Sequence, residues 1–352
     1  MTSKNIVVLA GAAAVLGVAA YMTSSGRKFK TPALNGKPVV AQFAAADVAA
    51  IDVGDKLALA AGEKGWVVKS LHGYPADVSK IRENILKLQD LKVGQVARGR
   101  KIDKPVKVTL KGSGGKELAS LEMGGQHMGK PRGQMAQFGG GGYPDGRYVK
   151  FRDEVVLVKD ALDAFDGDFK KWVDTRICAV SASDVTDVVY ASGGEKVELK
   201  RKDSSWELKG LGAKEELDTS KTYSLDSALS YLDMSGVADP KLGEAELGFA
   251  TGAVYTVRLK DGKSYIAKIG NAVDGERYFK VSASFAPVGT NATENAALEK
   301  AVKEFNERTA KWTYTIASYS ADSMSKKRKD LVKAKEEPKK DDKADKKADE
   351  KK

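Results

Sequence analysis

Apolar residues recur along this chain at two spacings, and each spacing predicts a different element. In the segment 78–91 they follow one another at steps of three and four, which places them on one face of a helix. These residues are Val78, Ile81, Ile85, Leu88 and Leu91. Asp77 precedes the segment and is suited to cap the helix, because its carboxylate can accept hydrogen bonds from the free amides of the first turn.

Alternation of apolar and polar residues, the pattern of a half-buried strand, marks the next part of the chain. Val106, Val108 and Leu110 alternate with polar residues, and the glycine-rich turn 112–115 leads to a second strand at 118–123. Further short strands are predicted at 48–53, 57–60, 67–68, 148–151 and 155–158. A closing helix is predicted over 158–172, with an apolar stripe formed by Val158, Leu162, Phe165, Phe169 and Trp172.

The four tryptophans form two pairs with one spacing. Trp206 follows Trp66 by 140 residues (206 − 66), and Trp312 follows Trp172 by 140 residues (312 − 172). Because tryptophan is rare, this coincidence indicates a tandem duplication. The period is far longer than the ~20–50 residues of a solenoid repeat, so the repeated unit is a small domain. Each tryptophan is expected to anchor a core.

The second repeat carries the same kinds of segments as the first. Strands are predicted at 185–190, 197–199, 206–208, 254–259, 265–269 and 278–281, and helices near 225–232 and at 298–312. Residues 147–150 (Arg-Tyr-Val-Lys) resemble residues 277–280 (Arg-Tyr-Phe-Lys) at a spacing of 130, as insertions between the repeats would require. Hairpin-rich strands with one or two helices on a face predict the α+β class with antiparallel sheet.

The length of 352 residues suits two domains of about 100–150 residues with additional segments at both ends. We divide the chain into a membrane anchor or signal segment, a linker, the first repeat, the second repeat and a disordered lysine-rich tail. Their bounds are 1–30, 31–46, 47–175, 176–318 and 319–352.

Residues 5–22 are almost entirely apolar, with Lys4 before them and Arg27, Lys28 and Lys30 after them. Eighteen helical residues span about 27 Å, enough for a thin hydrocarbon core. Three interpretations remain open: an uncleaved transmembrane helix, a signal peptide that is cleaved so that the protein is secreted, and a buried helix. We expect a single-pass protein of the bacterial inner (cytoplasmic) membrane, with its body in the periplasm or extracytoplasmic space.

Nearly half of the net charge of +11 comes from the end of the chain. Residues 325–352 hold thirteen basic and eight acidic residues (13 − 8 = +5) and no aromatic residue. Such a segment cannot bury enough apolar surface to fold, so we expect a solvating tail, or one that touches anionic lipid or polymer. No basic and aromatic platform accompanies the charge, and nucleic acid is not expected as a partner.

The residues 124–146 form a loop rich in glycine and methionine that has no counterpart in the second repeat. It is open to three interpretations: a metal site, a partner-binding loop, and an unstructured insertion. The soft ligands that would suit Cu(I) are Met123, His127, Met128 and Met135. They lack a repeated spacing, and we predict no metal and no cofactor.

No residue pattern points to catalysis. Asp160, Asp163, Asp166 and Asp168 lack the ligand spacing of a calcium loop, and we expect a solvated helix face. The one cysteine, Cys178, is expected to be a small buried side chain. Residues 61–65 only echo a phosphate loop. We therefore predict no catalytic residue and no enzyme.

Three short motifs occur once in each repeat. A turn around tryptophan lies at 64–68 and 205–208, a strand entry at 102–105 and 247–250, and a strand end with glycine at 121–124 and 267–270. By these motifs the chain resembles a bacterial family of domains of unknown function, number 4340. The resemblance implies an N-terminal membrane segment, repeated βα units, and a role beside ABC-transporter components of the gliding-motility type.

The main hypothesis is therefore a membrane-anchored, envelope-facing, non-enzymatic accessory protein of an ABC-type transport or gliding-like complex. Its expected partners are an ABC-type permease or associated subunit, and the lipid bilayer through residues 5–22. A periplasmic module that binds an anionic envelope polymer is the alternative, since the sequence pI is about 9.3. An uncharacterised envelope enzyme is a second alternative.

Overall fold

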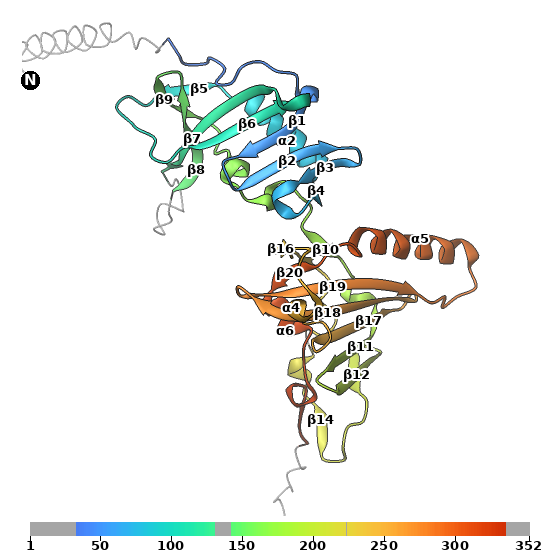
Figure 1. The fold of residues 1–352 in the computed structure, drawn as a ribbon. Coiled ribbons are helices and arrows are strands. Elements are labelled where there is room, and N and C mark those ends of the chain that lie inside the picture. Colours follow the sequence, from blue (N-terminus) through green and yellow to red (C-terminus); the bar gives the residue numbers. More distant parts are fainter. Residues whose placement is uncertain (1–32, 131–141, 223, 336–352) are drawn as a thin grey trace, which may run out of the picture. The chain divides into compact units, whose positions relative to one another are not determined.

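The computed structural model describes residues 33–130, 142–222 and 224–335 (Figure 1). These residues divide into two compact units. Unit 1 comprises residues 33–67 and 77–172, and unit 2 comprises residues 68–76 and residues from 173 onward. Both are built mainly from antiparallel strands with a few helices, which confirms the predicted α+β class.

A nine-stranded sheet with the order β4-β3-β2-β1-β6-β7-β8-β9-β5 dominates the first half of the chain. Its strands are β1 (Val48–Val53), β2 (Leu57–Gly62), β3 (Gly65–Val68), β4 (Tyr74–Pro75), β5 (Val93–Val96), β6 (Val106–Gly112), β7 (Glu117–Gly129), β8 (Tyr143–Phe151) and β9 (Glu154–Val158). The helix α2 (Val78–Gln89) contributes Ile81, Ile85 and Leu88 to the core. Short 3-10 turns η4 (Asp163–Asp166) and η5 (Phe169–Lys171) follow β9.

Unit 2 contains an eight-stranded sheet with the order β13-β12-β11-β17-β18-β19-β20-β16. Its strands are β11 (Val185–Ser192), β12 (Glu195–Lys202), β13 (Ser205–Leu208), β16 (Gly236–Val237), β17 (Ala253–Leu259), β18 (Lys263–Val273), β19 (Glu276–Phe285) and β20 (Tyr314–Ala317). Two small pairs accompany it: β10 (Arg176–Cys178) with β15 (Leu232–Asp233), and β14 (Glu215–Leu217) with β21 (Val332–Ala334). Its helices are α4 (Glu244–Leu247), α5 (Ala292–Thr309) and α6 (Ser318–Ser323).

The two large sheets share one strand order. Without β4, the first sheet runs β3-β2-β1-β6-β7-β8-β9-β5, and each of these strands has a counterpart at the same place in the second sheet. The central hairpins β6-β7 and β17-β18 are equivalent, as are the edge strands β5 and β16, which come early in each unit and pair with a late strand. The same path of the chain is therefore followed twice.

Arginines at equivalent positions stabilise an irregularity that both sheets share. The pairing of β7 with β8 shifts after Met123, and the pairing of β18 with β19 shifts after Ile269. Arg147 donates from Nε to the carbonyl oxygen of Gly124 (3.0 Å), and Arg277 donates likewise to Gly270 (2.9 Å). The matching residues 147–150 and 277–280 are therefore structurally equivalent, and so are the strand-end glycines Gly124 and Gly270. A bulge leaves carbonyl oxygens outside the ladder, and the guanidinium groups satisfy them.

The helix α2 begins as predicted. The carboxylate of Asp77 accepts hydrogen bonds from the amides of Ser79 (2.8 Å) and Lys80 (3.3 Å), so the predicted N-cap is confirmed. Val78, which the spacing placed on the apolar face, is 59% exposed. It lies in the first helical turn, where the side chain has no neighbouring turn of helix behind it.

Only one of the two tryptophan pairs occupies equivalent positions. Trp66 and Trp206 are each the second residue of an equivalent strand, β3 and β13. Trp172, by contrast, follows β9, whereas Trp312 precedes β20, the counterpart of β9. The 140-residue spacing of the second pair is therefore coincidental. Trp172 is fully buried, while the other three are half-buried, so the expected core-anchoring role holds fully for Trp172 alone.

The predicted closing helix over 158–172 is wrong. Val158 ends the strand β9, and the chain then passes through η4 and η5. Leu162 adopts a left-handed conformation (φ +50°), and Gly167 does likewise (φ +89°), so two residues interrupt any helix. The residues Val158, Leu162, Phe165 and Trp172 are buried because an irregular segment folds onto the core. The spacing of apolar residues alone could not distinguish this segment from a helix.

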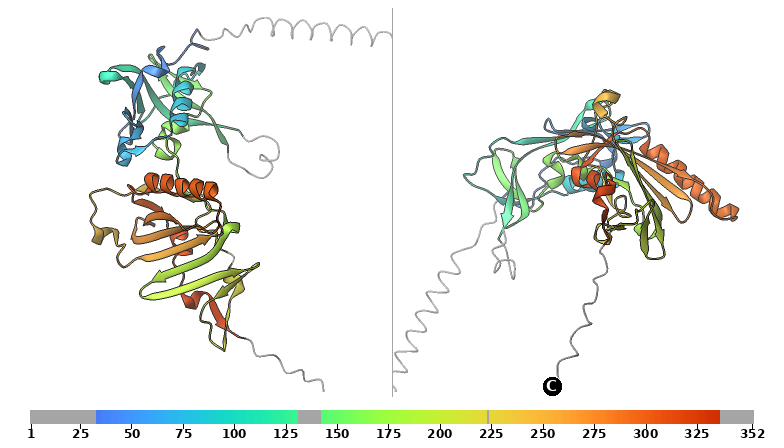
Figure 2. Two further views of the ribbon diagram at one scale, coloured as in Figure 1. Left: turned by 90° about the vertical axis from the view of Figure 1, so that its right-hand side faces the viewer. Right: turned by 90° about the horizontal axis from the view of Figure 1, so that it is seen from below.

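In unit 2 the two predicted helices have different outcomes. Residues 224–230 form turns in place of the helix expected near 225–232. The helix expected over 298–312 is confirmed as α5, although it begins earlier, at Ala292, and ends at Thr309. The helix lies beside β19 (Figure 2), where the side-chain amide of Asn306 bonds both backbone groups of Ala283 at 2.8 Å.

The beginning of the lysine-rich segment, which composition assigned to a disordered tail from residue 319, belongs to unit 2 as far as Lys335. It forms α6, the 3-10 turn η8 (Arg328–Asp330) and β21, and Leu331 is fully buried. Arg328 donates to the carbonyl oxygen of Gly210 (2.9 Å) and pairs with Glu215 (2.5 Å). These contacts and the buried Leu331 hold the segment on unit 2. The average composition did not predict this, because it does not show that single apolar residues among the lysines can pack into a core.

Among residues 33–130, 142–222 and 224–335, no helix is both long enough and apolar enough to cross a membrane. The predicted membrane segment at 5–22 lies outside these residues.

Candidate functional site

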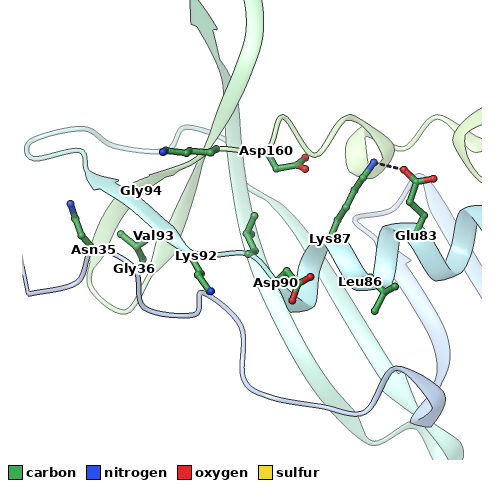
Figure 3. A pocket seen from close by; sticks show the side chains of 12 residues that line it. Asn35, Gly36, Glu83, Leu86, Lys87, Asp90, Lys92, Val93, Gly94 and Asp160 are labelled. Atoms are coloured by element: carbon green, nitrogen blue, oxygen red, sulfur yellow. Dashed lines mark ion pairs between the residues drawn. The ribbon is translucent and has the colours of Figure 1, made fainter.

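A groove of about 650 Å³ lies in unit 1 between α2, β5 and the segment that carries Asn35 and Gly36 (Figure 3). Its walls combine charged side chains with an apolar surface. The lining residues are Asn35, Gly36, Glu83, Leu86, Lys87, Asp90, Leu91, Lys92, Val93, Gly94, Lys159 and Asp160. Of this set, only Asp160 is among the aspartates whose spacing excludes a calcium loop, and the sequence predicts no residue of the set as a site residue.

The groove forms where α2 ends and the chain turns into the outermost strand of the sheet. Asp90 is the last residue of the helical turn, and β5 starts three residues later. Backbone hydrogen bonds hold the preceding segment against this strand, from Gly36 to Val93 (2.7 Å) and from Val93 to Lys37 (2.9 Å). The segment pairs with the start of this strand at Val93, and the next strand residue, Gly94, also lines the groove.

Positive and negative side chains are balanced around the groove. The carboxylates are Glu83, Asp90 and Asp160, and the ammonium groups are Lys87, Lys92 and Lys159. Glu83 and Lys87 form an ion pair at 2.8 Å along α2, and this hydrogen bond raises the pKa of Lys87 above its ordinary value. Glu83 is exposed and Lys87 is half-buried at the surface of the helix, so the pair contributes little to stability.

Two further features give the groove binding character. Leu86 exposes 40% of its surface beside this ion pair, although it lies on a helix that packs on the core. The side-chain oxygen of Asn35 is buried and has no hydrogen-bond partner within the part of the chain that the structure describes. A buried acceptor without a donor favours a ligand group or water that donates to it.

The chemistry of these residues suits recognition. The described residues contain no group of three histidine, cysteine, aspartate or glutamate side chains that could hold a metal ion. The groove lining includes no serine, cysteine or histidine, and its ionisable groups are the three carboxylates and the three lysines. Apolar surface flanked by charges of both signs is typical of a surface that binds another polypeptide.

The loop residues that could have held a metal ion are in different environments. Met123 is buried in β7, whereas Met128 in the same strand is 52% exposed. Nδ1 of His127 lies 2.5 Å from the carboxylate of Asp145. Met135 lies outside the described residues. Strand β7 extends to Gly129 and β8 starts at Tyr143, so both ends of the predicted loop belong to the sheet.

The four aspartates after β9 each have a separate structural partner. The carboxylates of Asp160 and Asp168 accept from the backbone amides of Leu162 (2.7 Å) and Lys170 (3.0 Å). The other two form ion pairs, Asp163 with Lys171 (2.7 Å) and Asp166 with Arg147. They hold the turns η4 and η5 in place and do not converge on one point.

The cysteine is buried as expected. Cys178 lies in β10 with a free thiol, and burial raises its pKa to about 12. A thiol of this kind stays protonated and is unreactive.

Sequence comparison defines the class of protein to which this fold belongs. The family model described as "Domain of unknown function (DUF4340)" matches residues 66–250. This is more than half of the chain, and the protein belongs to that family. The matched region starts at Trp66 in β3 and runs through unit 1 into unit 2, as far as the residues after α4. No curated protein and no solved structure matches the chain.

Proposed function

We propose that this protein is a membrane-anchored, envelope-facing accessory subunit of an ABC-type transport or gliding-like complex, and that it acts through protein–protein contacts. Residues 5–22 would provide the anchor, and the two repeats of the duplicated α+β unit would form the body on the extracytoplasmic side.

The groove beside α2 and β5 is the observation that carries this proposal. Its balanced charges and exposed Leu86 match a polypeptide surface with both charged and apolar groups. An outermost strand next to a groove also offers backbone groups to a partner segment, which could add to the sheet edge.

The proposal is tested by purifying the full-length chain from membranes and identifying what accompanies it. We expect an ABC-type permease or an associated subunit to be recovered with the wild-type protein. Leu86→Glu should abolish this recovery, because a new charge would enter the groove beside Glu83. Val78→Glu is the matched control, since Val78 lies on the same helix, is exposed and does not line the groove.

Equal recovery of the partner with both variants would contradict a role for the groove. Recovery of the chain alone, or its presence in the soluble fraction, would contradict the accessory role altogether. Sequencing the N-terminus of the mature protein separates the anchor from a cleaved signal peptide, because cleavage would remove residues 5–22.

A further inference from the structure

A second cavity of unit 1, of about 600 Å³, gathers two arginines, a histidine and a tyrosine. Arg98 and Arg100 come from the turn after β5, His127 from β7 and Tyr148 from β8. Its remaining walls are formed by Gln95, Val96, Ala97, Gly99 and Leu157. It shares no lining residue with the groove beside α2.

The backbone fixes the two arginines on one short turn. The amide of Ala97 donates to Val155 in β9 (2.8 Å), and the amide of Arg100 donates back to Ala97 (3.1 Å). Gly99 adopts φ +74°, the left-handed conformation that lets the chain reverse between the arginines. Both guanidinium groups are therefore presented from a turn that is attached to the sheet.

An aromatic platform orients Arg100. Its guanidinium carbon lies 3.7 Å from the ring centre of Tyr148, within range of a cation–π contact. The imidazole of His127 meets the same ring edge-on at 5.8 Å, and Asp145 holds that imidazole through Nδ1. The platform keeps the guanidinium plane in one orientation, so its N–H groups are available in a fixed fork.

Asp145 pairs with the imidazole of His127 in this cavity, but the two arginines keep their positive charge. Within the described parts of the chain neither Arg98 nor Arg100 forms an ion pair, and no carboxylate lines the cavity. Other arginines do have carboxylate partners, namely Arg147, Arg176, Arg201 and Arg328. Two neighbouring guanidinium groups without a counter-ion attract an anion, most strongly one that carries two negative charges.

We propose that this cavity binds a phosphate group carried by a small polar molecule or a lipid headgroup. The planar guanidinium of Arg100 pairs with two phosphate oxygens, and Arg98 supplies a second positive charge opposite the nearly two negative charges that a phosphate monoester carries near pH 7. The volume exceeds that of one phosphate and accommodates a glycerol or sugar unit against Val96 and Leu157. This site does not depend on the accessory role proposed above.

Isothermal titration calorimetry of the full-length chain in detergent tests the site. The probes are inorganic phosphate, glycerol 3-phosphate, short-chain phosphatidylglycerol and glucuronate, at constant ionic strength. We expect Arg98→Gln and Arg100→Gln each to weaken phosphate binding about tenfold, because each removes charge-assisted hydrogen bonds. Arg82→Gln is the matched control: Arg82 is exposed on α2, outside the cavity, and its replacement should leave binding unchanged.

Binding of the two soluble phosphates that depends on both arginines would support a free phosphate ligand. Arginine-dependent binding of phosphatidylglycerol alone would support a lipid headgroup. The site is overturned if no probe binds, if Arg82→Gln weakens binding as much as the other variants, or if glucuronate binds as tightly as glycerol 3-phosphate. The three replaced arginines are exposed, and equal thermal unfolding of the variants confirms that they fold.

Discussion

Replacing Arg147 by methionine is expected to destabilise unit 1 strongly. This side chain is only 7% exposed and bonds three groups, one in β7 and two at the turn η4. It donates to the carbonyl oxygens of Gly124 (3.0 Å) and Leu162 (2.9 Å), and it pairs with Asp166. Methionine keeps most of the apolar stem but leaves both carbonyl oxygens without this donor.

The size of the effect follows from the burial of each partner. Each charge-assisted hydrogen bond to a buried carbonyl is worth about 1.5–3 kcal/mol, and the two losses are not independent. Asp166 is 42% exposed, so the loss of its ion pair adds at most about 1 kcal/mol. The free energy of unfolding of unit 1 should therefore fall by about 3–5 kcal/mol.

Arg277→Met in unit 2 is the matched comparison. Arg277 is half-buried and donates through Nε and Nη2 to one carbonyl oxygen, that of Gly270. Its replacement should cost about 1.5–3 kcal/mol, less than the change at Arg147.

Hydrogen–deuterium exchange measured by mass spectrometry reports on each unit separately, which a single unfolding curve for two units does not. For Arg147→Met we expect faster exchange in β7, β8 and residues 160–167, and no change in β18 and β19. The reasoning is refuted if the two variants lose the same stability, or if Arg147→Met loses less than about 1 kcal/mol.

Three further outcomes are expected. Asp77→Ala should destabilise α2 by about 1 kcal/mol through loss of its N-cap, seen as faster exchange confined to this helix; Asp77→Asn should retain most of the stability. Gly270→Ala should cost unit 2 about 3 kcal/mol, measured by hydrogen exchange in its sheet, because its Cβ would overlap a backbone carbonyl oxygen of α4. A cost below about 1 kcal/mol would contradict this. Hydrogen bonds from Lys196 and Lys209 hold the pKa of Glu198 at about 2. The contribution of this carboxylate to the stability of unit 2 should therefore be complete above about pH 4.5 and disappear as the pH falls through 2. Carbon NMR titration of the Glu198 carboxyl group checks the value, and an ordinary midpoint near 4.5 would contradict the pairing.

The sequence allowed much of the fold to be predicted, because the strongest signals are local. Alternation located β6 and β17, and steps of three and four together with Asp77 located α2. Trp66 and Trp206 correctly marked equivalent strands because each lies in the strand that directly follows the first hairpin of its sheet, β1-β2 or β11-β12, with only a short turn between.

The failures occur where a long insertion or an irregular segment mimics a local signal. The helix α5 interrupts the hairpin of β19 and β20, so Trp172 and Trp312 agree in spacing although they lie on opposite sides of equivalent strands. The apolar stripe ending at Trp172 belongs to turns fixed by aspartates and by the left-handed Leu162. Backbone conformations of this kind depend on tertiary contacts that a period cannot reveal.

The candidate sites could not be predicted because their residues are ordinary and distant in sequence. The groove joins Asn35 to Asp160, and the phosphate cavity joins Arg98 to Tyr148. Arg98 and Arg100 are recognisable in the sequence as a pair around a glycine, but their lack of carboxylate partners is visible only when the neighbouring strands are in place.

The shared strand order has a practical use in engineering this protein. Strands β8 and β9 are joined by two residues, Arg152 and Asp153, whereas residues 286–313, including α5, separate the equivalent strands β19 and β20. The second sheet pairs Glu276–Phe279 with Tyr314–Ala317 despite this long excursion. Because loop-closure entropy grows slowly with length, the turn at Arg152 is a natural insertion point for a fluorescent or affinity tag. A tag there would leave both termini of the chain untouched.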